Sequence, residues 1–478
     1  MRIGGLERLR ITKAVLAVFA LGALISPLNL TLSARAVTAP ADGDVSEPRE
    51  LEVFQGYLDP APRGMDVRYA WTLPGGRGEN IKLIDIEVNW NLDHQDLVEA
   101  VSNSFLVVRG VDPQPQFNVD HGTAVLGEIV AAPDGVGVTG IAHRAQLGLI
   151  NPVTQGTTPK VADAIKMATR RLDPGDILLI EQQSLAGPRF DGLTGRGLLP
   201  IEFERPVFDA IKAATSKGII VIEPAGNGFE DLDDPAYKGV FDRRVQDSGA
   251  IFVGAGLPEP GIYGAGPDRV RTDESNYGSR VDVQGWGRFV TTCGYGPLRR
   301  EQGPNKIYTD IFGATSAAAA MVAGAAGVLQ SIIKARGLDP LTPAQLRQLL
   351  ISTGSPQKGN LRQRVGPRPD LKAAIEALTI DEHDRTPLIT GLIYKKGKGN
   401  LIIDGANFLT RDSVIEIDGT AVPRMKYPNE FALPNGTTSR VANKGNISAM
   451  LPAGVQVAVT VFSPSTGKRS EPVAFTNE

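Results

Sequence analysis

The sequence has few of the residues that mark disulfide-stapled or nucleic-acid-binding proteins. It contains one cysteine, Cys293, so no disulfide can form within the chain. Its 50 basic and 53 acidic residues leave a formal net charge of -3, which offers no electrostatic basis for binding nucleic acid or a charged membrane surface. A large hydrophobic core must therefore stabilise the fold, and we expect Cys293 to be a small buried hydrophobe in it.

The N-terminus carries the pattern of a signal peptide. Basic residues precede the apolar run Ala14–Ile25, and the small-x-small pattern Ala34-Arg35-Ala36 follows it. The run is too short to span a bilayer comfortably. We predict cleavage after Ala36 and a secreted, extracellular protein of bacterial type, with the periplasm as an alternative destination. An uncleaved signal anchor is the alternative reading of the segment.

Composition divides the rest of the chain into regions. Residues 37–50 are polar and proline-rich, 379–387 are charged, and from Leu388 onward short alternating runs are separated by Gly and Pro. The predicted organisation is a signal peptide at 1–36, a linker or short pro-segment at 37–64, a catalytic domain at 65–378, a linker at 379–387 and an all-β sandwich at 388–478.

The catalytic region alternates short apolar runs with amphipathic segments. This order predicts an α/β domain with a doubly wound, mostly parallel sheet and helices on both faces. The strands are expected at Ile81–Ile86, Gln146–Ile150, Asp176–Ile180, Ile219–Glu223 and Ala250–Val253. The helices are expected at His121–Ala131, Val161–Arg171, Pro206–Ser216, Ser316–Ala335, Pro343–Ser352 and Asp370–Leu378.

Three segments of this region carry reactive side chains. Asp85 ends an apolar strand, so its carboxylate lies at the sheet edge where open α/β folds bind ligands. His121 is expected at a helix start, with Gly122 leaving room for close approach. Ser316 opens a helix of very small residues that can be buried deeply. A serine hydroxyl needs a base and the base needs an orienting acid, so His121 and Asp85 are candidates for these roles.

A negative charge that develops on a substrate carbonyl needs fixed hydrogen-bond donors. The segment Ala225-Gly226-Asn227-Gly228 follows a predicted strand and offers the Asn227 amide as one donor. The backbone N–H of Ser316, at the start of its helix, would be the second. Taken alone, Asn227 between two glycines is an ordinary turn residue.

These segments together resemble the signatures of the subtilisin-like serine proteases (peptidase family S8). The resemblance rests on Leu83-Ile84-Asp85, His121-Gly122-Thr123, Ala225–Gly228 and Thr315-Ser316, in that order along the chain. It covers about residues 65–378 and implies a serine endopeptidase with Asp85, His121 and Ser316 as catalytic triad and Asn227 as oxyanion donor. Four positions depart from the family pattern. Glu87 and Ala314 stand where glycine is commoner, Ala320 stands where proline is usual, and Met321 replaces a frequent histidine.

The resemblance also implies a substrate strand and an accessory module. Ser184, Leu185 and Ala186 lie where an extended peptide would pair with an edge strand, although an ordinary surface loop fits them as well. The segments from Leu388 to Gly419 resemble an immunoglobulin-like fold of the IPT/TIG type. Such a module would contact a surface, a substrate or a partner, or act as a passive spacer.

No cofactor is expected for the chemistry, and the metal ligands are left unassigned. Structural calcium at the acidic segment Asp231–Asp234 is an expectation from the family, with a solvated loop as its alternative. The expected partners are protein or peptide substrates, without nucleic acid and without stable membrane insertion after signal cleavage.

Two other functions compete with an active endopeptidase. The first is an inactive or highly selective pseudoprotease that acts as an extracellular binding protein through its β-sandwich. The intact set Asp85, His121, Asn227 and Ser316 argues against it. The second is an acid-active relative of the sedolisins with a glutamate base, against which His121-Gly122-Thr123 speaks.

Overall fold

The computed structural model describes residues 51–110, 115–154, 159–259, 266–378, 386–428, 431 and 437–477, with side chains from residue 119 onward in the second of these ranges. The predicted signal peptide, residues 37–50 of the predicted first linker, and most of the predicted second linker lie outside the described residues.

A seven-stranded parallel sheet forms the centre of the larger unit, in the order β2-β3-β1-β4-β7-β8-β9. Its strands are β1 (Lys82–Ile86), β2 (Leu106–Val108), β3 (Gln146–Ile150), β4 (Ile177–Ile180), β7 (Ile220–Pro224), β8 (Ile251–Gly256) and β9 (Val283–Trp286). The order reverses about β1, as in doubly wound folds, so the predicted fold class is confirmed.

Helices cover both faces of this sheet. They are α2 (Val67–Ala70), α3 (Val98–Ser102), α4 (Pro115–Val130), α5 (Val161–Thr169), α6 (Arg205–Ser216), α7 (Ala314–Ala335), α8 (Pro343–Thr353) and α9 (Leu371–Ala377). Side chains of α4 and α7 share one buried cluster with Leu83 and Leu179. Side chains of α5 and α6 share the other with Ile84 and Ile180. Since strand residues alternate between faces, odd-numbered positions of β1 and β4 face α4 and α7.

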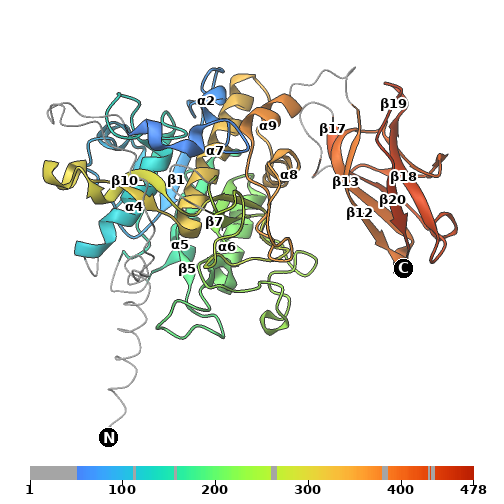
Figure 1. The fold of residues 1–478 in the computed structure, drawn as a ribbon, viewed down its shortest axis with the longest axis horizontal. Helices are drawn as coiled ribbons and strands as arrows, with labels where there is room; N and C mark the ends of the chain where they lie inside the picture. The colour runs from blue at the N-terminus through green and yellow to red at the C-terminus, as the bar shows by residue number, and fades with distance from the viewer. Residues whose placement is uncertain are drawn as a thin grey trace, which may run out of the picture.

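Helix α7 lies at the centre of this unit (Figure 1). It contacts β4, β7, β8, β9 and α4. Its Ala- and Gly-rich sequence lets the neighbouring backbones approach closely. Among the described residues it is the one helix long and apolar enough to cross a membrane, but its apolar stretch is buried inside the unit. It is therefore accounted for as a core helix.

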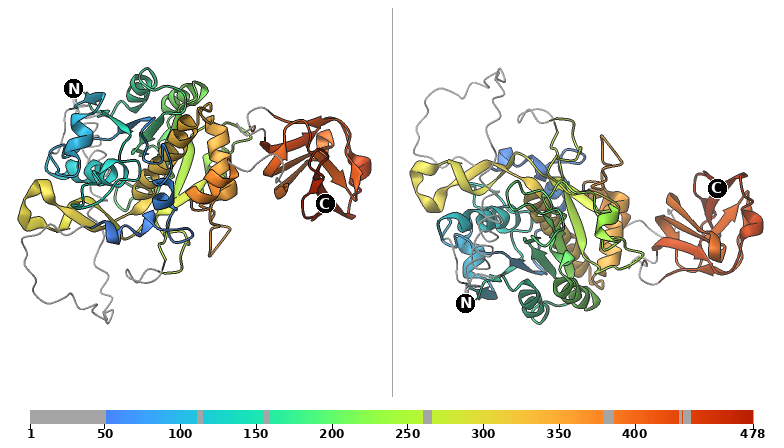
Figure 2. Two further views of the ribbon diagram at one scale, coloured as in Figure 1. Left: turned by 90° about the horizontal axis from the view of Figure 1, so that it is seen from above. Right: turned by 90° about the horizontal axis from the view of Figure 1, so that it is seen from below.

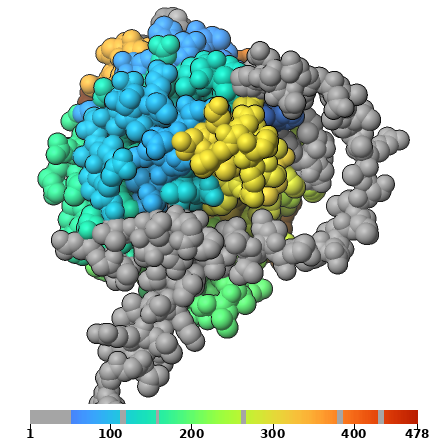
Figure 3. Space-filling view, turned by 90° about the vertical axis from the view of Figure 1, so that its left-hand side faces the viewer, coloured from blue at the N-terminus to red at the C-terminus, as the bar shows by residue number. Residues whose placement is uncertain are grey.

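An antiparallel pair, β10 (Val290–Leu298) and β11 (Tyr308–Phe312), lies outside the central sheet and packs on α4. Figure 3 shows this pair in yellow on the surface, beside the cyan and blue residues of the α4 side. Cys293 in β10 is fully buried, as expected. Burial raises the pKa of its thiol well above the usual range, so it is an inert part of the core.

The C-terminal residues form two antiparallel sheets with a shared apolar core. One sheet has the order β12-β13-β17-β16, and the other has the order β15-β14-β18-β19, with β20 paired to β18. The strands are β12 (Leu388–Lys395), β13 (Asn400–Leu409), β14 (Val414–Ile417), β15 (Thr420–Ala421), β16 (Met425–Lys426), β17 (Thr437–Asn443), β18 (Gln456–Ser463), β19 (Lys468–Arg469) and β20 (Val473–Thr476). Both views of Figure 2 place this unit beside the larger one. The arrangement is consistent with the predicted β-sandwich.

The structure corrects one helix boundary and adds two strands to the predicted sheet. Helix α4 begins at Pro115, so His121 lies near the end of its second turn rather than at the helix start. The sequence before His121 shows no apolar period, and only the proline at the first helical position marks the start. Strands β2 and β9 had no predicted counterpart, because β2 is short and Gln284-Gly285 interrupts the apolar run of β9.

The close packing of α7 gives a test with two glycines of the same helix. A Cβ at Gly324 would lie 2.8 Å from the Cβ of Ile141, whereas a Cβ at Gly327 would lie 3.1 Å from the flexible tip of Ile81. Both Ala substitutions gain about 1 kcal/mol of helix propensity, but overpacking at a branch point costs about 1–3 kcal/mol. Thermal unfolding should show a lower Tm for Gly324→Ala and an unchanged or higher Tm for Gly327→Ala. Equal shifts for both would contradict this packing.

Candidate active site

The imidazole of His121 is held by a carboxylate that follows β1. Its Nδ1 pairs with a carboxylate oxygen of Glu87. The Glu87 side chain is 5% exposed and the His121 side chain 31% exposed. With Nδ1 committed, Nε2 is the ring nitrogen available for proton transfer. Gly122 allows this arrangement, because a Cβ there would collide with the Asn89 carbonyl oxygen and the Glu87 side chain, so the expected need for room is confirmed.

Asp85 lies near His121 but does not form the hydrogen bond that we expected. Its Oδ2 accepts a hydrogen bond from Trp90 Nε1 at 2.8 Å, and its Oδ1 has no hydrogen-bond partner in the described part of the chain. Asp85 and Glu87 project from the same face of β1, since they are two residues apart. Glu87 is longer and stands further toward the sheet edge, so it reaches the ring. Sequence reasoning noted Glu87 only as a replacement of glycine, although this shared face was a signal for it.

Burial and the neighbouring acids shift both titrations. Burial, reinforced by the charge of Glu87, raises the pKa of Asp85 well above its usual range, against the opposing effects of Trp90 and His121. Burial alone would lower the pKa of His121, but the charge and hydrogen bond of Glu87, together with Asp85, raise it. The imidazole therefore keeps its proton to a higher pH than a free histidine does.

Ser316 is the third residue of α7 and is 7% exposed. Its backbone N–H has no acceptor inside the helix, because the first turn of an α-helix leaves its N–H groups free. Ala314, two residues earlier, has φ 61°, a left-handed conformation that costs a residue with a Cβ about 1–2 kcal/mol. No hydrogen bond joins the Ser316 hydroxyl to the His121 ring within the described ranges.

The side chain of Asn227 is fixed against the residue before Ser316. Its Oδ1 accepts hydrogen bonds from the Thr315 N–H at 3.0 Å and from Thr315 Oγ1 at 2.7 Å. Its own N–H donates to Gln183 Oε1 at 2.7 Å. With Oδ1 occupied, the amide nitrogen Nδ2 is the group left to donate. This geometry suits a donor for a developing oxyanion.

Asn276 braces the loop that carries Asn227, and sequence reasoning missed it. Its Nδ2 donates to the carbonyls of Leu198 and Ala225, both at 2.8 Å. Its Oδ1 accepts from the N–H groups of Gly228 and Glu230. The side chain thus satisfies four backbone groups, and no motif around Asn276 in the sequence could have revealed this.

The predicted substrate-binding residues surround a very short strand. Ser184 ends β5 (Gln183–Ser184), which pairs antiparallel with β6 (Leu199–Pro200). The Ser184 hydroxyl donates to Glu204 and accepts from the Ala186 N–H, and Ser184 is completely buried. Leu185 is half-buried and Ala186 exposed. Their contact with substrate stays a prediction.

The acidic segment that we considered for calcium is bonded to the protein. Asp233 accepts from the backbone and hydroxyl of Ser279, and Asp234 accepts from Arg189 and the Ala236 N–H. The expectation of structural calcium stays a prediction.

One group in the described ranges has the spacing of metal ligands: His94, Asp96 and Cys293. Asp96 accepts hydrogen bonds from Tyr308 and from the Val138 N–H, and His94 Nε2 lies 3.0 Å from the Ile307 carbonyl oxygen. These contacts account for the group as a buried polar network beneath β10.

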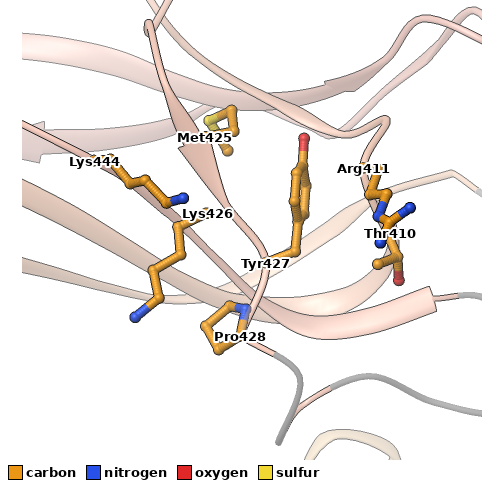
Figure 4. A pocket seen from close by; sticks show the side chains of 7 residues that line it. All are labelled: Thr410, Arg411, Met425, Lys426, Tyr427, Pro428 and Lys444. Carbon is orange, nitrogen blue, oxygen red and sulfur yellow. The ribbon is translucent and has the colours of Figure 1, made fainter.

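A cavity of about 400 Å³ lies in the C-terminal unit. Figure 4 shows Lys426 and Lys444 on one side of Tyr427 and Arg411 on the other. The cavity contains none of the predicted site residues. It is a feature of the β-sandwich and separate from the reactive groups of the larger unit.

The larger unit is similar to known proteins. Residues 76–368 match the subtilase family, Peptidase_S8. The chain is 26% identical over 307 residues to an intracellular serine protease of Paenibacillus polymyxa, covering 62% of this chain and 80% of that protein. It is 27% identical over 290 residues to subtilisin DY of Bacillus licheniformis, covering 59% of this chain and 86% of that protein.

Two further comparisons are more distant. An extracellular serine protease of Aeromonas sobria is 26% identical over 312 residues, covering 58% of this chain and 48% of that protein. The solved structure of the patellamide maturation protease PatA is 20% identical, covers 62% of this chain and 96% of that chain, and has a TM-score of 0.44.

The strained residue before the nucleophile segment gives a stability test. Glycine adopts a positive φ without steric cost, so Ala314→Gly should raise the free energy of unfolding by about 1 kcal/mol. The same substitution at Ala318, in the regular part of α7, should lower it by about 1 kcal/mol or more. Denaturant unfolding of both variants measures this difference. A loss of stability in Ala314→Gly as large as in Ala318→Gly would contradict the conformation at Ala314.

Proposed function

Because the chain belongs to the subtilase family and is therefore a serine-type peptidase, we propose that it is an endopeptidase acting through an acyl-enzyme on Ser316. The observation that carries this proposal is the imidazole of His121, held at Nδ1 by a buried carboxylate on the sheet face that α7 covers. The Thr315–Asn227 bonds add a positioned amide next to Ser316.

The proposed reaction begins when His121 Nε2 takes the proton of the Ser316 hydroxyl as Oγ attacks the scissile carbonyl carbon. Asn227 Nδ2 and the Ser316 N–H stabilise the oxyanion that forms. His121 then gives its proton to the leaving amine as the C–N bond breaks, which leaves the acyl group on Ser316. Water repeats the sequence, and hydrolysis returns the proton and the free serine.

We assign to Glu87 the role of holding the His121 ring in its orientation, and to Asp85 the role of a neighbour of Glu87 that does not bond to the ring. The Nδ1–Glu87 contact fixes the tautomer that leaves Nε2 unprotonated when the imidazole is neutral. Asp85 remains the acid expected from the family resemblance. Its raised pKa and its bond to Trp90 support a role as a neutral or hydrogen-bonded neighbour of Glu87 rather than as the group that holds the ring.

We further propose that the protein is secreted and acts on proteins or peptides. The N-terminal sequence supports secretion, whereas the relatives' names point both ways, one being intracellular and one extracellular. Protein or peptide substrates follow from the family. We propose that such peptides pair with the segment Ser184–Ala186 and that the C-terminal β-sandwich contacts a surface or partner.

A fluorophosphonate probe, which reacts only with an activated serine, tests the enzyme against the pseudoprotease. We expect the wild type to be labelled and Ser316→Ala to lose labelling completely. Ser331→Ala is the matched control, because Ser331 lies on the same buried helix, bonded to Asn80, away from the reactive groups. Absence of labelling in folded wild type would favour the binding scaffold.

The assignment of the orienting acid has its own test. Glu87→Gln replaces the carboxylate on Nδ1 and should lower kcat by about 10³–10⁴-fold, as loss of the orienting acid does in a serine triad. Asp85→Asn, which removes a carboxyl that burial keeps largely neutral, should cost about tenfold or less. Steady-state kinetics on a peptide substrate measures both variants. If kcat fell more in Asp85→Asn than in Glu87→Gln, Asp85 would be the acid that orients His121.

A further inference from the structure

A third acidic residue follows the next strand at the same sheet edge. Glu181 comes directly after β4, and its N–H donates to the Ile86 carbonyl at 3.1 Å, beside β1. It lies two residues after Leu179, which packs in the α4 and α7 cluster, so its side chain projects toward the same helices as Asp85 and Glu87 do. Glu181 is 6% exposed.

The carboxyl group of Glu181 is buried, and few hydrogen bonds are present that would stabilise its ionised form. Neither oxygen has a close hydrogen-bond partner within the described ranges. The groups that influence its titration are Asp85 on β1, Glu87 just after β1, Glu128 on α4 and the Ser316 hydroxyl on α7. Burial, and then the charges of the three acids, raise its pKa well above the usual range, and the Ser316 hydroxyl alone opposes them. The neutral acid is therefore the form that this environment favours.

Glu128 extends this neutral cluster along α4. It lies two turns after His121 on the same helix and is completely buried. Both of its oxygens also lack a partner within the described ranges, and burial raises its pKa well above the usual range. A buried polar group without a partner costs about 1–3 kcal/mol, so two such neighbouring acids need a reason other than stability.

We propose that Glu181 is a further catalytic residue, which in its neutral form donates a hydrogen bond to the Ser316 hydroxyl oxygen. The inference rests on the proposed function of Ser316 and His121. A donated O–H occupies a lone pair of Oγ and leaves the hydroxyl proton of Ser316 to His121 Nε2. Glu181 keeps its own proton through acylation and deacylation, so it adds no proton to the reaction balance.

Ionised Glu181 has the opposite effect. A carboxylate only accepts hydrogen bonds, so it draws the Ser316 proton toward itself and competes with His121. Its negative charge also lies beside the reacting centre, where the oxyanion of the intermediate develops. Activity should therefore fall as the pH rises through the pKa of Glu181, while the low-pH limit reflects protonation of His121.

The test is the pH profile of fluorophosphonate labelling and of kcat/KM in Glu181→Gln. Glutamine has the shape of the neutral acid and can donate from its amide nitrogen, but it cannot ionise. We expect wild-type kcat/KM to fall about tenfold per pH unit on the alkaline side, and this fall to vanish or move to higher pH in Glu181→Gln. Glu128→Gln, which removes a neighbouring acid, should move the fall to lower pH.

Glu223→Gln is the matched control, since Glu223 is a buried acid near Glu202 and Arg280 on the other face of the sheet. Its pH profile should follow the wild type. If kcat/KM of Glu181→Gln still fell at alkaline pH as in the wild type, the inference would be overturned. Loss of activity at every pH would overturn it too, because the carboxylate would then act as a base. If the proposed function itself were wrong, the wild type would not be labelled by the fluorophosphonate, so the two failures can be told apart.

Discussion

The hydrogen bond between His121 Nδ1 and Glu87 is the interaction on which the site depends. It fixes one ring nitrogen and leaves the other for a proton from Ser316. It also decides which of the surrounding acids is paired with a cation, because Glu87 occupies the Nδ1 position of His121. Asp85 and Glu181 are buried nearby and form no hydrogen bond with this cation, so burial drives both toward their neutral forms. One charge pair among several carboxyl groups is an arrangement in which neighbouring titrations diverge.

The scaffold holds this arrangement through close backbone contacts. Gly122 admits the Asn89 carbonyl beside the histidine, and Gly226, with φ 94°, places Asn227 where its oxygen meets Thr315. Ala314 takes a positive φ at the start of the nucleophile helix. Such strain persists only where the surroundings fix it, as here where the Ala314 N–H donates to the Gly287 carbonyl at 2.9 Å.

Much of the architecture could be predicted from the sequence, since buried parallel strands are short apolar runs. Runs such as Ile177–Ile180 therefore identified five strands. Strand β9 escaped because Gln284 and Gly285 break the pattern, although Gln284 is buried and bonded to the Gly366 carbonyl. The contacts of Asn276 could not be predicted either, because its partners, Leu198 and three residues between 225 and 230, lie far from it along the chain.

The site residues show the same limit. His121, Asn227 and Ser316 stand in motifs, so their positions could be identified. The choice between Asp85 and Glu87 depends on side-chain length and on how far each lies from the sheet edge, which a motif does not encode. Glu181 and Glu128 lie in an ordinary strand end and an ordinary helix. Only the packing of β4 and α4 around α7 brings Glu181 close to both Ser316 and Glu128.

An NMR titration of His121 tests the central claim most directly. The account predicts a His121 pKa above 6.5 in the wild type, a marked fall when Glu87 is replaced by glutamine, and a smaller change when Asp85 is replaced by asparagine. A His121 pKa that is indifferent to Glu87 but falls on loss of Asp85 would contradict it.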